Sequence, residues 1–258
     1  MEIIDGLQRI NSIVRFLKGE LTLKLPGTEY NGKKYSVDDE VVAGIANKHI
    51  NCTFIEQLNP DTEESGKYEI FKILNQGSVS LTAHEVRRCV YESEFTDLLS
   101  ELNKNENWRK LYGRKFDNAK NRYYDEEIIL RSFCMCLSDL NKMSNLTKEI
   151  NKLSHHLKSK DNFDKYKDRL VNIFNEACNF LRNIDLGTKN KAVIDAILST
   201  AMYKSWKDID VEITQEKVDA LKSDDDFKKF SSSTTGSKSN VIGRFLKAKE
   251  ILLGIYAE

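Results

Sequence analysis

Proline is almost absent from this chain, and that scarcity constrains its fold more than any other feature. The 258 residues include two prolines, Pro26 and Pro60, and none follows residue 60. Proline breaks helix interiors, so the remainder of the chain is free to form long helices. Apolar residues recur there at spacings of three and four, the period of a helix with one buried face. A mostly helical protein is therefore predicted.

Three stretches carry the strongest helical period. Residues 128–137 are apolar on nearly every face, which predicts a central buried helix. Arg131 lies within this helix and predicts a buried or half-buried ion pair, whose partner the sequence does not identify. The other two stretches predict core-facing stripes, made of Leu170, Ile173, Phe174, Ala177, Cys178 and Leu181, and of Ile194, Ile197, Leu198 and Ala201.

Strand-like patterns are confined to the first 62 residues or so. Residues 20–24 alternate between apolar and polar side chains, and residues 50–55 are apolar and β-branched, so both ranges predict short strands. Asn31-Gly32 is typical of a hairpin turn. A helix is expected from Ser36 or Asp38 to Ile45. The predicted class is α+β and predominantly α, with a small α/β region at the N-terminus followed by a multi-helix lobe.

The N-terminal motif predicts a helix start that could hold an anion. A strand-like run, residues 2–4, meets an Asp-Gly turn, and apolar residues follow at helical spacing from residue 10 to residue 17. This places Asp5 at the N-cap and Gly6 to Arg9 in the first turn, where free N–H groups and the helix dipole favour a phosphate. Arg9 opposes the dipole there unless an anion is bound. A capping box between Asp5 and Gln8 explains the same residues without a ligand.

The charge balance argues against bulk electrostatic binding of nucleic acid. Lys and Arg number 40, Asp and Glu number 40, and the formal net charge is zero. One local stretch remains a candidate nucleic-acid surface because aromatic residues interleave with its cations, and the alternative is a solvated connector with aromatic anchors. Its cations are Lys110, Arg114, Lys115, Lys120 and Arg122, and its aromatics are Trp108, Tyr112, Phe116, Tyr123 and Tyr124.

Cysteine usage and hydropathy indicate a cytoplasmic protein. The five cysteines show no metal-like pairing, so a reducing compartment and no metal site are expected. No apolar run approaches the length of a membrane span, and the N-terminus lacks the pattern of a signal peptide.

The motif Asp5-Gly-Leu-Gln-Arg9 resembles the Asp-Gly-Gln-Gln-Arg signature of the GmrSD-type restriction endonuclease N-terminal domain family, which is similar to ParB and sulfiredoxin folds. Residues 71–87, 122–133 and 232–244 resemble later conserved blocks of that family in the same order, so the resemblance covers nearly the whole chain. Leu7 departs from the signature by replacing its first Gln. The family's upstream strands and Arg-containing loop do not precede Met1, so we expect another chain to supply them or this product to be a truncated relative.

This resemblance implies a nucleotide-binding, and in several members nucleotide-hydrolysing, module of a prokaryotic restriction or phage-defence system that acts on modified DNA. Residues 1–75 would form a partial ParB-like nucleotide-binding region, and residues 76–258 a helical lobe. The implied ligand is a nucleoside triphosphate with Mg²⁺, bound by Gly6, Arg9 and Asn75. Asp5, Gln8 and Arg9 would carry any hydrolysis, while DNA cleavage would belong to a partner nuclease chain or domain.

Several alternatives stay open at this stage. The chain could instead be a non-catalytic module whose helical lobe contacts DNA or a partner protein, with a vestigial nucleotide pocket. A homo-oligomer stays open in either case. Asn75 could serve only in a helix C-cap. Glu85, Arg87 and Arg88 could form a solvated face or an internal set of salt bridges.

Overall fold

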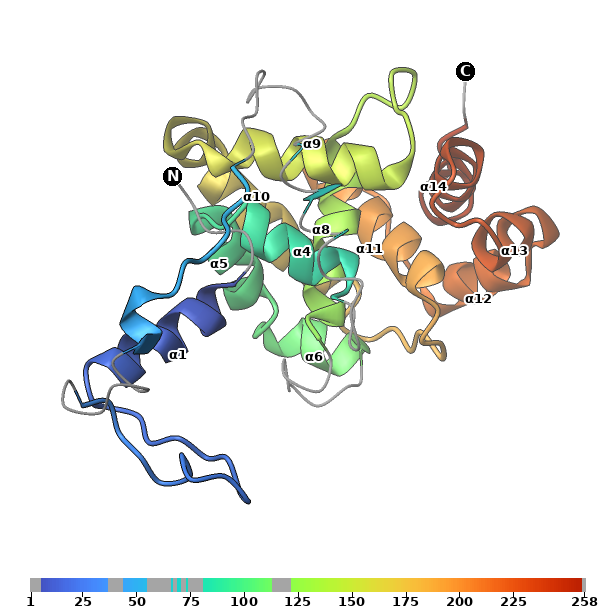
Figure 1. Cartoon of the computed structure of the whole chain (residues 1–258). Helices are drawn as coiled ribbons and strands as arrows, with labels where there is room; N and C mark the ends of the chain where they lie inside the picture. The colour runs from blue at the N-terminus through green and yellow to red at the C-terminus, as the bar shows by residue number, and fades with distance from the viewer. Residues whose placement is uncertain are drawn as a thin grey trace.

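Helix α8 (Tyr124–Leu137) lies at the centre of the helical lobe (Figure 1). The computed structural model describes residues 6–36, 44–54, 66, 69–70, 73, 81–112 and 122–256. Eleven of the 14 residues of α8 are buried, which confirms the predicted central helix. Its apolar surface is covered by α5, α9 and α11, so α8 is the element around which the lobe is packed.

The lobe consists of ten described helices. Helix α10 packs against α5, α6, α9 and α11, while α12, α13 and α14 form one end of the lobe (Figure 1). The two predicted core stripes, which lie on α10 and α11, are buried as expected. Besides α8, the helices are α4 (Ala83–Val90), α5 (Glu94–Leu102), α6 (Glu106–Tyr112), α9 (Leu146–Lys158), α10 (Lys160–Phe180), α11 (Lys191–Trp206), α12 (Gln215–Ser223), α13 (Asp225–Ser232) and α14 (Lys238–Leu253).

Side-chain caps begin most of these helices. Thr82 and Glu85 form a reciprocal capping box at α4, and four further N-caps accept a backbone N–H at α9, α11, α12 and α13. Helix α14 is capped by Ser237 and ends at Gly254, whose φ of 72° suits a glycine C-cap. Asx and hydroxyl side chains thus supply partners for amides that the helices themselves cannot satisfy.

The N-terminal segment contains α1 (Leu7–Leu17) and the 3₁₀-helix η1 (Gly44–Asn47). The predicted strands at residues 20–24 and 50–55 are wrong for the residues described there, which form no strand. Leu23 exchanges two backbone hydrogen bonds of 2.8 Å with Gly32 and Lys33, so the chain does reverse. The reversal runs through residues 24–31 rather than turning at Asn31-Gly32, and one bonded pair is too short to make a sheet. The fold is predominantly α, without the expected α/β element among the described residues.

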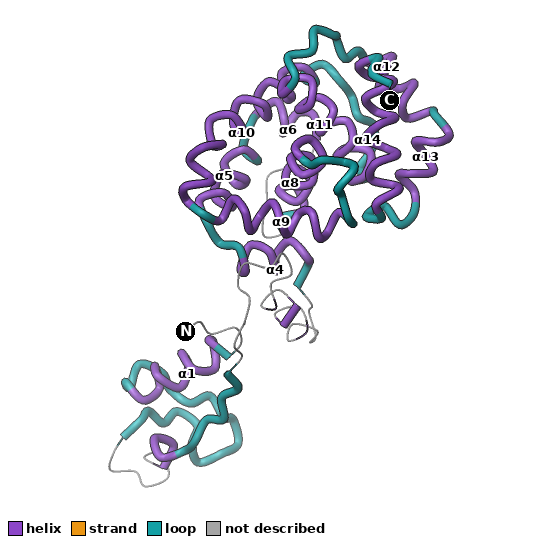
Figure 2. The backbone as a smooth tube through the Cα atoms, turned by 90° about the horizontal axis from the view of Figure 1, so that it is seen from above, coloured by secondary structure: helices purple, strands orange, loops and turns teal. Residues whose placement is uncertain are grey.

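This N-terminal segment has almost no core of its own. Phe16 is its only residue with a described side chain that is buried, and Tyr35 packs edge-to-face against it at 6.1 Å. Apolar side chains of α1 remain open to solvent, with Leu7 52% and Val14 41% exposed. Figures 1 and 2 show the segment lying apart from the helical lobe. The expected boundary between residues 75 and 76 falls outside the described residues.

Within the described part of the chain, no helix combines the length and apolar character needed to cross a membrane.

Helices α13 and α14 approach each other closely at Gly243, so we predict that Gly243→Ala destabilises the lobe. An added Cβ would lie 2.7 Å from Cε2 of Phe230 and would have to displace that ring. Overpacking of this kind costs about 1–3 kcal/mol, although helix propensity alone would predict a gain of up to about 1 kcal/mol. Urea unfolding gives the sign directly.

Gly236→Ala serves as the control for this prediction. Nothing lies within 4 Å of its added Cβ, so we expect a neutral or slightly stabilising effect. If Gly243→Ala were stabilising as well, the close contact with Phe230 would have no energetic consequence.

Candidate functional site

The turn at Gly6 begins helix α1. Gly6 is the N-cap, with φ 88° and ψ 1°, a left-handed conformation that glycine adopts without strain. The prediction of Asp5 as the N-cap is therefore wrong by one residue, because the left-handed Gly6 is itself the residue before the first helical one. Gln8 becomes the second helical residue, so the predicted capping-box register is wrong too. Asp5 lies outside the described residues.

The guanidinium group of Arg9 folds back over Gly6. Its Nη2 and Nε lie 3.6 and 3.8 Å from the position that a Cβ on residue 6 would occupy. A left-handed residue followed by a right-handed one directs successive backbone N–H groups into one concavity, which suits an anion. The N–H groups of Leu7 and Gln8 are the first two amides of α1 and have no acceptor inside the helix. Backbone donors and a cation are thus brought together at this turn.

The other predicted nucleotide and nucleic-acid residues are only partly visible. Asn75, Arg114, Lys115 and Lys120 lie outside the described residues. Lys110 is exposed on α6, and Arg122 pairs with Glu85, with its Nη2 2.6 Å from Oε2. The sequence analysis predicted that these cations share one surface. Of the two that are described, Lys110 lies on α6, whereas Arg122 is engaged in a salt bridge to α4.

The aromatic residues of the same stretch anchor the lobe. Trp108 and Tyr112 are buried and stack on each other, with ring centroids 5.1 Å apart. The indole N–H of Trp108 donates to Asn103, and the guanidinium of Arg109 reaches both Asn103 and Asp125. These two rings are therefore unavailable to stack on nucleic-acid bases.

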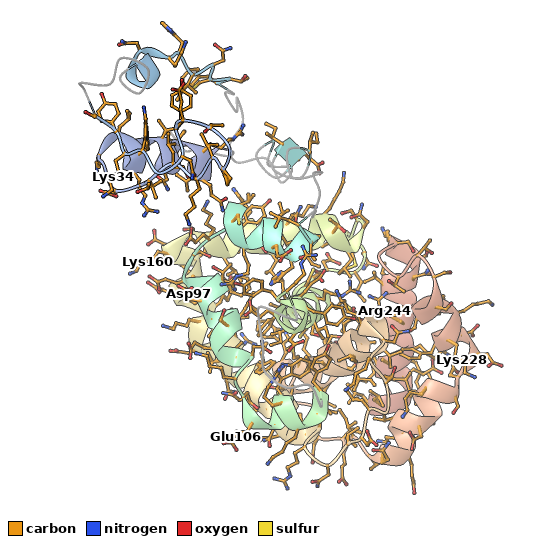
Figure 3. All side chains as sticks on the ribbon, turned by 60° about the horizontal axis from the view of Figure 1, so that its bottom comes forward. Lys34, Asp97, Glu106, Lys160, Lys228 and Arg244 are labelled. Carbon is orange, nitrogen blue, oxygen red and sulfur yellow. The ribbon has the colours of Figure 1, made fainter. Side chains whose placement is uncertain are left out.

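A buried cluster of three ionic residues joins α8, α11 and α14. Asp195 accepts from Nε of Arg131 at 2.6 Å and from Nε and Nη2 of Arg244 at 3.0 and 3.1 Å. Arg244 also donates to the carbonyl oxygen of Thr235 at 2.5 Å. It lies inside the lobe in Figure 3. The predicted ion pair of Arg131 is confirmed, and its partner is Asp195.

A second ionic cluster lies where α4 packs near the start of α8. Glu126 is fully buried and accepts from Arg88 at 2.5 Å and from the hydroxyl of Ser100 at 3.0 Å. The Arg88 guanidinium stacks over the ring of Tyr123, 4.5 Å from its centroid. Glu127 binds the ammonium of Lys191 on α11.

Together with the Glu85–Arg122 pair, these contacts show that Glu85 and Arg88 belong to an internal set of salt bridges. Arg87 belongs to the same set, since its Nε donates to the buried Asn151 at 2.8 Å and its Nη1 lies 3.8 Å from Glu127. Of the two alternatives considered for these residues, the internal one is confirmed.

Tyr123 and Ser237 set the starts of α8 and α14. Helix α8 begins after Tyr123, which is left-handed with φ 58°, and the carboxylate of Asp125 in its first turn binds Arg109. Helix α14 begins after Ser237, whose side chain accepts from the N–H of Asn240.

Burial and neighbouring charges set the protonation of the α4–α8 cluster. Burial lowers the pKa of His84, despite the carboxylate of Glu126 3.8 Å from its Nε2. Burial alone would raise the pKa of Glu126, but His84 and the charge of Arg88 bring that pKa below its usual value. The pKa of Glu127 is likewise lowered, because Lys191 outweighs the effect of burial. The carboxylates are therefore charged and His84 is neutral near pH 7.

These two clusters do not present an open reactive centre among the described residues. Their carboxylates are paired with cations, and only 1% of His84 is exposed, which suits interior cross-links better than acid–base chemistry. The clusters do join residues from three segments distant in sequence, 71–87, 122–133 and 232–244. Sequence reasoning missed Asp195, although a single carboxylate inside the apolar stripe of residues 192–202 was the signal that could have found it.

No family model, curated protein or solved structure matches this chain.

We predict that Asp195→Ala destabilises the protein by about 3–5 kcal/mol, because it leaves two guanidinium groups buried without their carboxylate. The free energy of unfolding in urea measures this loss. The control is Glu101→Ala, which removes an exposed pair with Lys104 (2.8 Å) and is expected to cost less than about 1 kcal/mol. If the two substitutions lowered the free energy of unfolding equally, burial of the cluster would make no difference to its contribution to stability.

We also predict that His84 contributes to acid destabilisation. Its folded pKa lies below the ordinary 6.5, so as the pH falls the unfolded chain takes up the proton first. The free energy of unfolding should therefore decrease as the pH is lowered from 6.5, and His84→Leu should remove that part of its pH dependence. Glu126 and Glu127, whose folded pKa values are lowered from 4.5, lose their stabilisation only at more acidic pH.

Urea unfolding of both proteins at a series of pH values measures the two slopes. Identical slopes for the parent and His84→Leu between neutrality and the carboxylate range would contradict a neutral, buried imidazole.

Proposed function

We propose that this chain is the nucleotide-binding module of a prokaryotic restriction or phage-defence system that acts on modified DNA. The observation that carries the proposal is the Gly6 turn, where a left-handed glycine, the first amides of α1 and the Arg9 guanidinium lie together. The resemblance of residues 5–9 to the Asp-Gly-Gln-Gln-Arg signature supports the same reading.

Elementary chemistry explains why a phosphate suits this turn. The backbone N–H groups of Leu7 and Gln8 lie at the positive end of the α1 dipole, and Gly6 has no Cβ to hold an anion away. Arg9 lies in the first turn beside the positive end of that dipole, and a bound anion would interact favourably with both charges. Its guanidinium would then form charge-assisted hydrogen bonds with phosphate oxygens.

The remaining parts of the proposed site are assigned by resemblance. Asn75 would contact the nucleotide, and Asp5 or Gln8 would orient a water molecule beside the phosphates or one on Mg²⁺. Residues 1–75 would complete a ParB-like pocket with strands from a further segment or a partner chain. The proposal concerns nucleotide binding, and nucleotide hydrolysis would be measured separately.

A second candidate function is a non-catalytic protein-interaction module. The observation that favours it is the apolar surface of the N-terminal segment, where Leu7 and Val14 on α1 and Phe54 further on, 73% exposed, lack cover. An apolar surface of this kind fits another protein chain better than DNA. In this reading Arg9 has no ligand, and an apolar-to-charged change such as Val14→Asp would weaken partner binding while Arg9→Ala would not.

We predict that the chain binds ATP or GTP in calorimetry, with or without Mg²⁺, and that Arg9→Ala weakens this binding about tenfold or more. Hydrogen bonds to charged groups contribute about 1.5–3 kcal/mol each, which justifies that factor. The matched control is Arg15→Ala on the same helix, since Arg15 is exposed and pairs with Glu20 at 3.5 Å, and it should bind like the parent.

Each outcome of this comparison favours one reading. Equal loss of affinity in both variants would indicate a diffuse charge effect rather than a phosphate site at Gly6. Absence of nucleotide binding by the parent chain, even together with its partner chain, would favour the interaction module.

A further inference from the structure

A cavity of about 300 Å³ lies between the start of α11 and helices α12 and α13. Its lining includes Thr188, Val193, Lys222, Phe227, Lys228 and Ser231. This end of the lobe is remote from α1 in Figures 1 and 2, so the cavity is separate from the Gly6 turn. Its volume is at the lower end of the range for small-molecule sites, which extends from about 300 to 1,000 Å³.

One hydroxyl group in this cavity has no partner within the described part of the chain. Ser231 is only 3% exposed, and its Oγ makes no hydrogen bond. Several other helical serines bond back to their own helix, as Ser132 does to Ile128 and Ser223 does to Asp219. Buried polar groups are nearly always satisfied, so this orphan hydroxyl beside the cavity is a candidate donor to a ligand or an ordered water.

The charges around the cavity favour an anion. Lys222 and Lys228 both line it, and Lys228 lies at the outer edge of the lobe in Figure 3. Their ammonium groups also donate to the carbonyl oxygens of Leu186 at 3.2 Å and Ser223 at 2.7 Å. Their carboxylate partners, Asp219 at 2.8 Å and Asp225 at 3.1 Å, are exposed and are not part of the lining. These carboxylates reduce the positive potential of the two lysines inside the cavity, but they do not fill the space where an anion would bind.

The end of α11 adds to the same potential. Asn190 caps this 16-residue helix by accepting from the amide of Ala192 at 2.9 Å, and the first turn contains no acidic residue. The positive end of the helix dipole lies near Asn190 and Val193 of the cavity lining, and Glu127, which binds Lys191 in that first turn, offsets part of it.

The opposite part of the lining is apolar. Val193 and the buried ring of Phe227 lie in the lining, so a ligand would also place hydrocarbon there. We propose that this cavity binds a small organic anion, a phosphate or carboxylate attached to a compact apolar group. The anion accepts from Ser231 and the lysines, and the apolar group packs on Val193 and Phe227.

Titration of the full-length ¹⁵N-labelled chain with phenyl phosphate, benzoate and benzyl alcohol, followed by NMR, tests this proposal. We expect saturable shifts of amides in residues 188–193 and 227–232 with phenyl phosphate, benzoate or both, and none with the neutral alcohol. The tighter of the two anions identifies the preferred headgroup. No saturable shift with either anion, or equal shifts with benzyl alcohol, would overturn the proposal.

Paired variants separate binding at this cavity from general charge effects. Lys228→Ala should weaken the anion about fivefold or more, as expected for the loss of one charge-assisted contact. Lys229→Ala changes the next residue of α13, which pairs with Asp226 at 3.9 Å and does not line the cavity, and should leave affinity unchanged. Equal weakening by both would mean non-specific attraction and would overturn the site.

Ser231→Ala adds a readout that a purely structural role would not give. Without ligand it should keep or raise the thermal midpoint, because it removes an unsatisfied buried hydroxyl, yet it should weaken the anion about fivefold. Unchanged affinity would remove Ser231 from the site. Arg9→Ala should bind these anions at the cavity like the parent, so failure here and failure of nucleotide binding at Gly6 are distinguishable.

Discussion

The buried carboxylate of Asp195 is the interaction on which the helical lobe depends. It accepts from two guanidinium groups, one on α8 and one on α14, and thereby fixes α11 between them. One carboxylate facing two arginines leaves positive charge inside the lobe, which Glu127 near Arg131 helps to balance. Desolvation offsets much of the attraction in a buried ion pair, so the intact pair adds little net stability, whereas the loss of one partner is costly. The cluster thus ties α8, α11 and α14 together through groups that depend on one another.

The N-terminal segment differs from the lobe in how it is held together. The lobe buries a continuous apolar cluster from α5 to α14, whereas the segment around α1 buries Phe16 and little else among its described residues. A segment of that size with so small a core gains little stability from its own packing. Its conformation, and with it the arrangement of Gly6 and Arg9, is then most open to influence from whatever binds there.

The sequence predicted what local periodicity determines and missed what depends on distant residues. The buried α8, the core stripes and the ion pair of Arg131 follow from apolar spacing and from a cation inside an apolar run. The partner Asp195 could not be chosen from sequence, because it is 64 residues away on another helix. The expected strands failed because alternation shows only a tendency, whereas a sheet requires a paired neighbour. The Gly6 turn was located correctly but one residue out of register, since no local rule distinguishes an Asp cap from a left-handed glycine cap.

The turn before α8 has a consequence for cooperativity. Arg122 and Tyr123 both have left-handed backbones, with φ 47° and 58°, which are strained for residues with side chains. Contacts from α4 hold both of them, since Glu85 binds Arg122 and Arg88 stacks on Tyr123. Without α4, the contacts that offset the backbone strain at Arg122 and Tyr123 are lost, and the first turn of α8 is destabilised. Helix α4 and the start of α8 are thus expected to unfold and reform as one unit in native-state fluctuations.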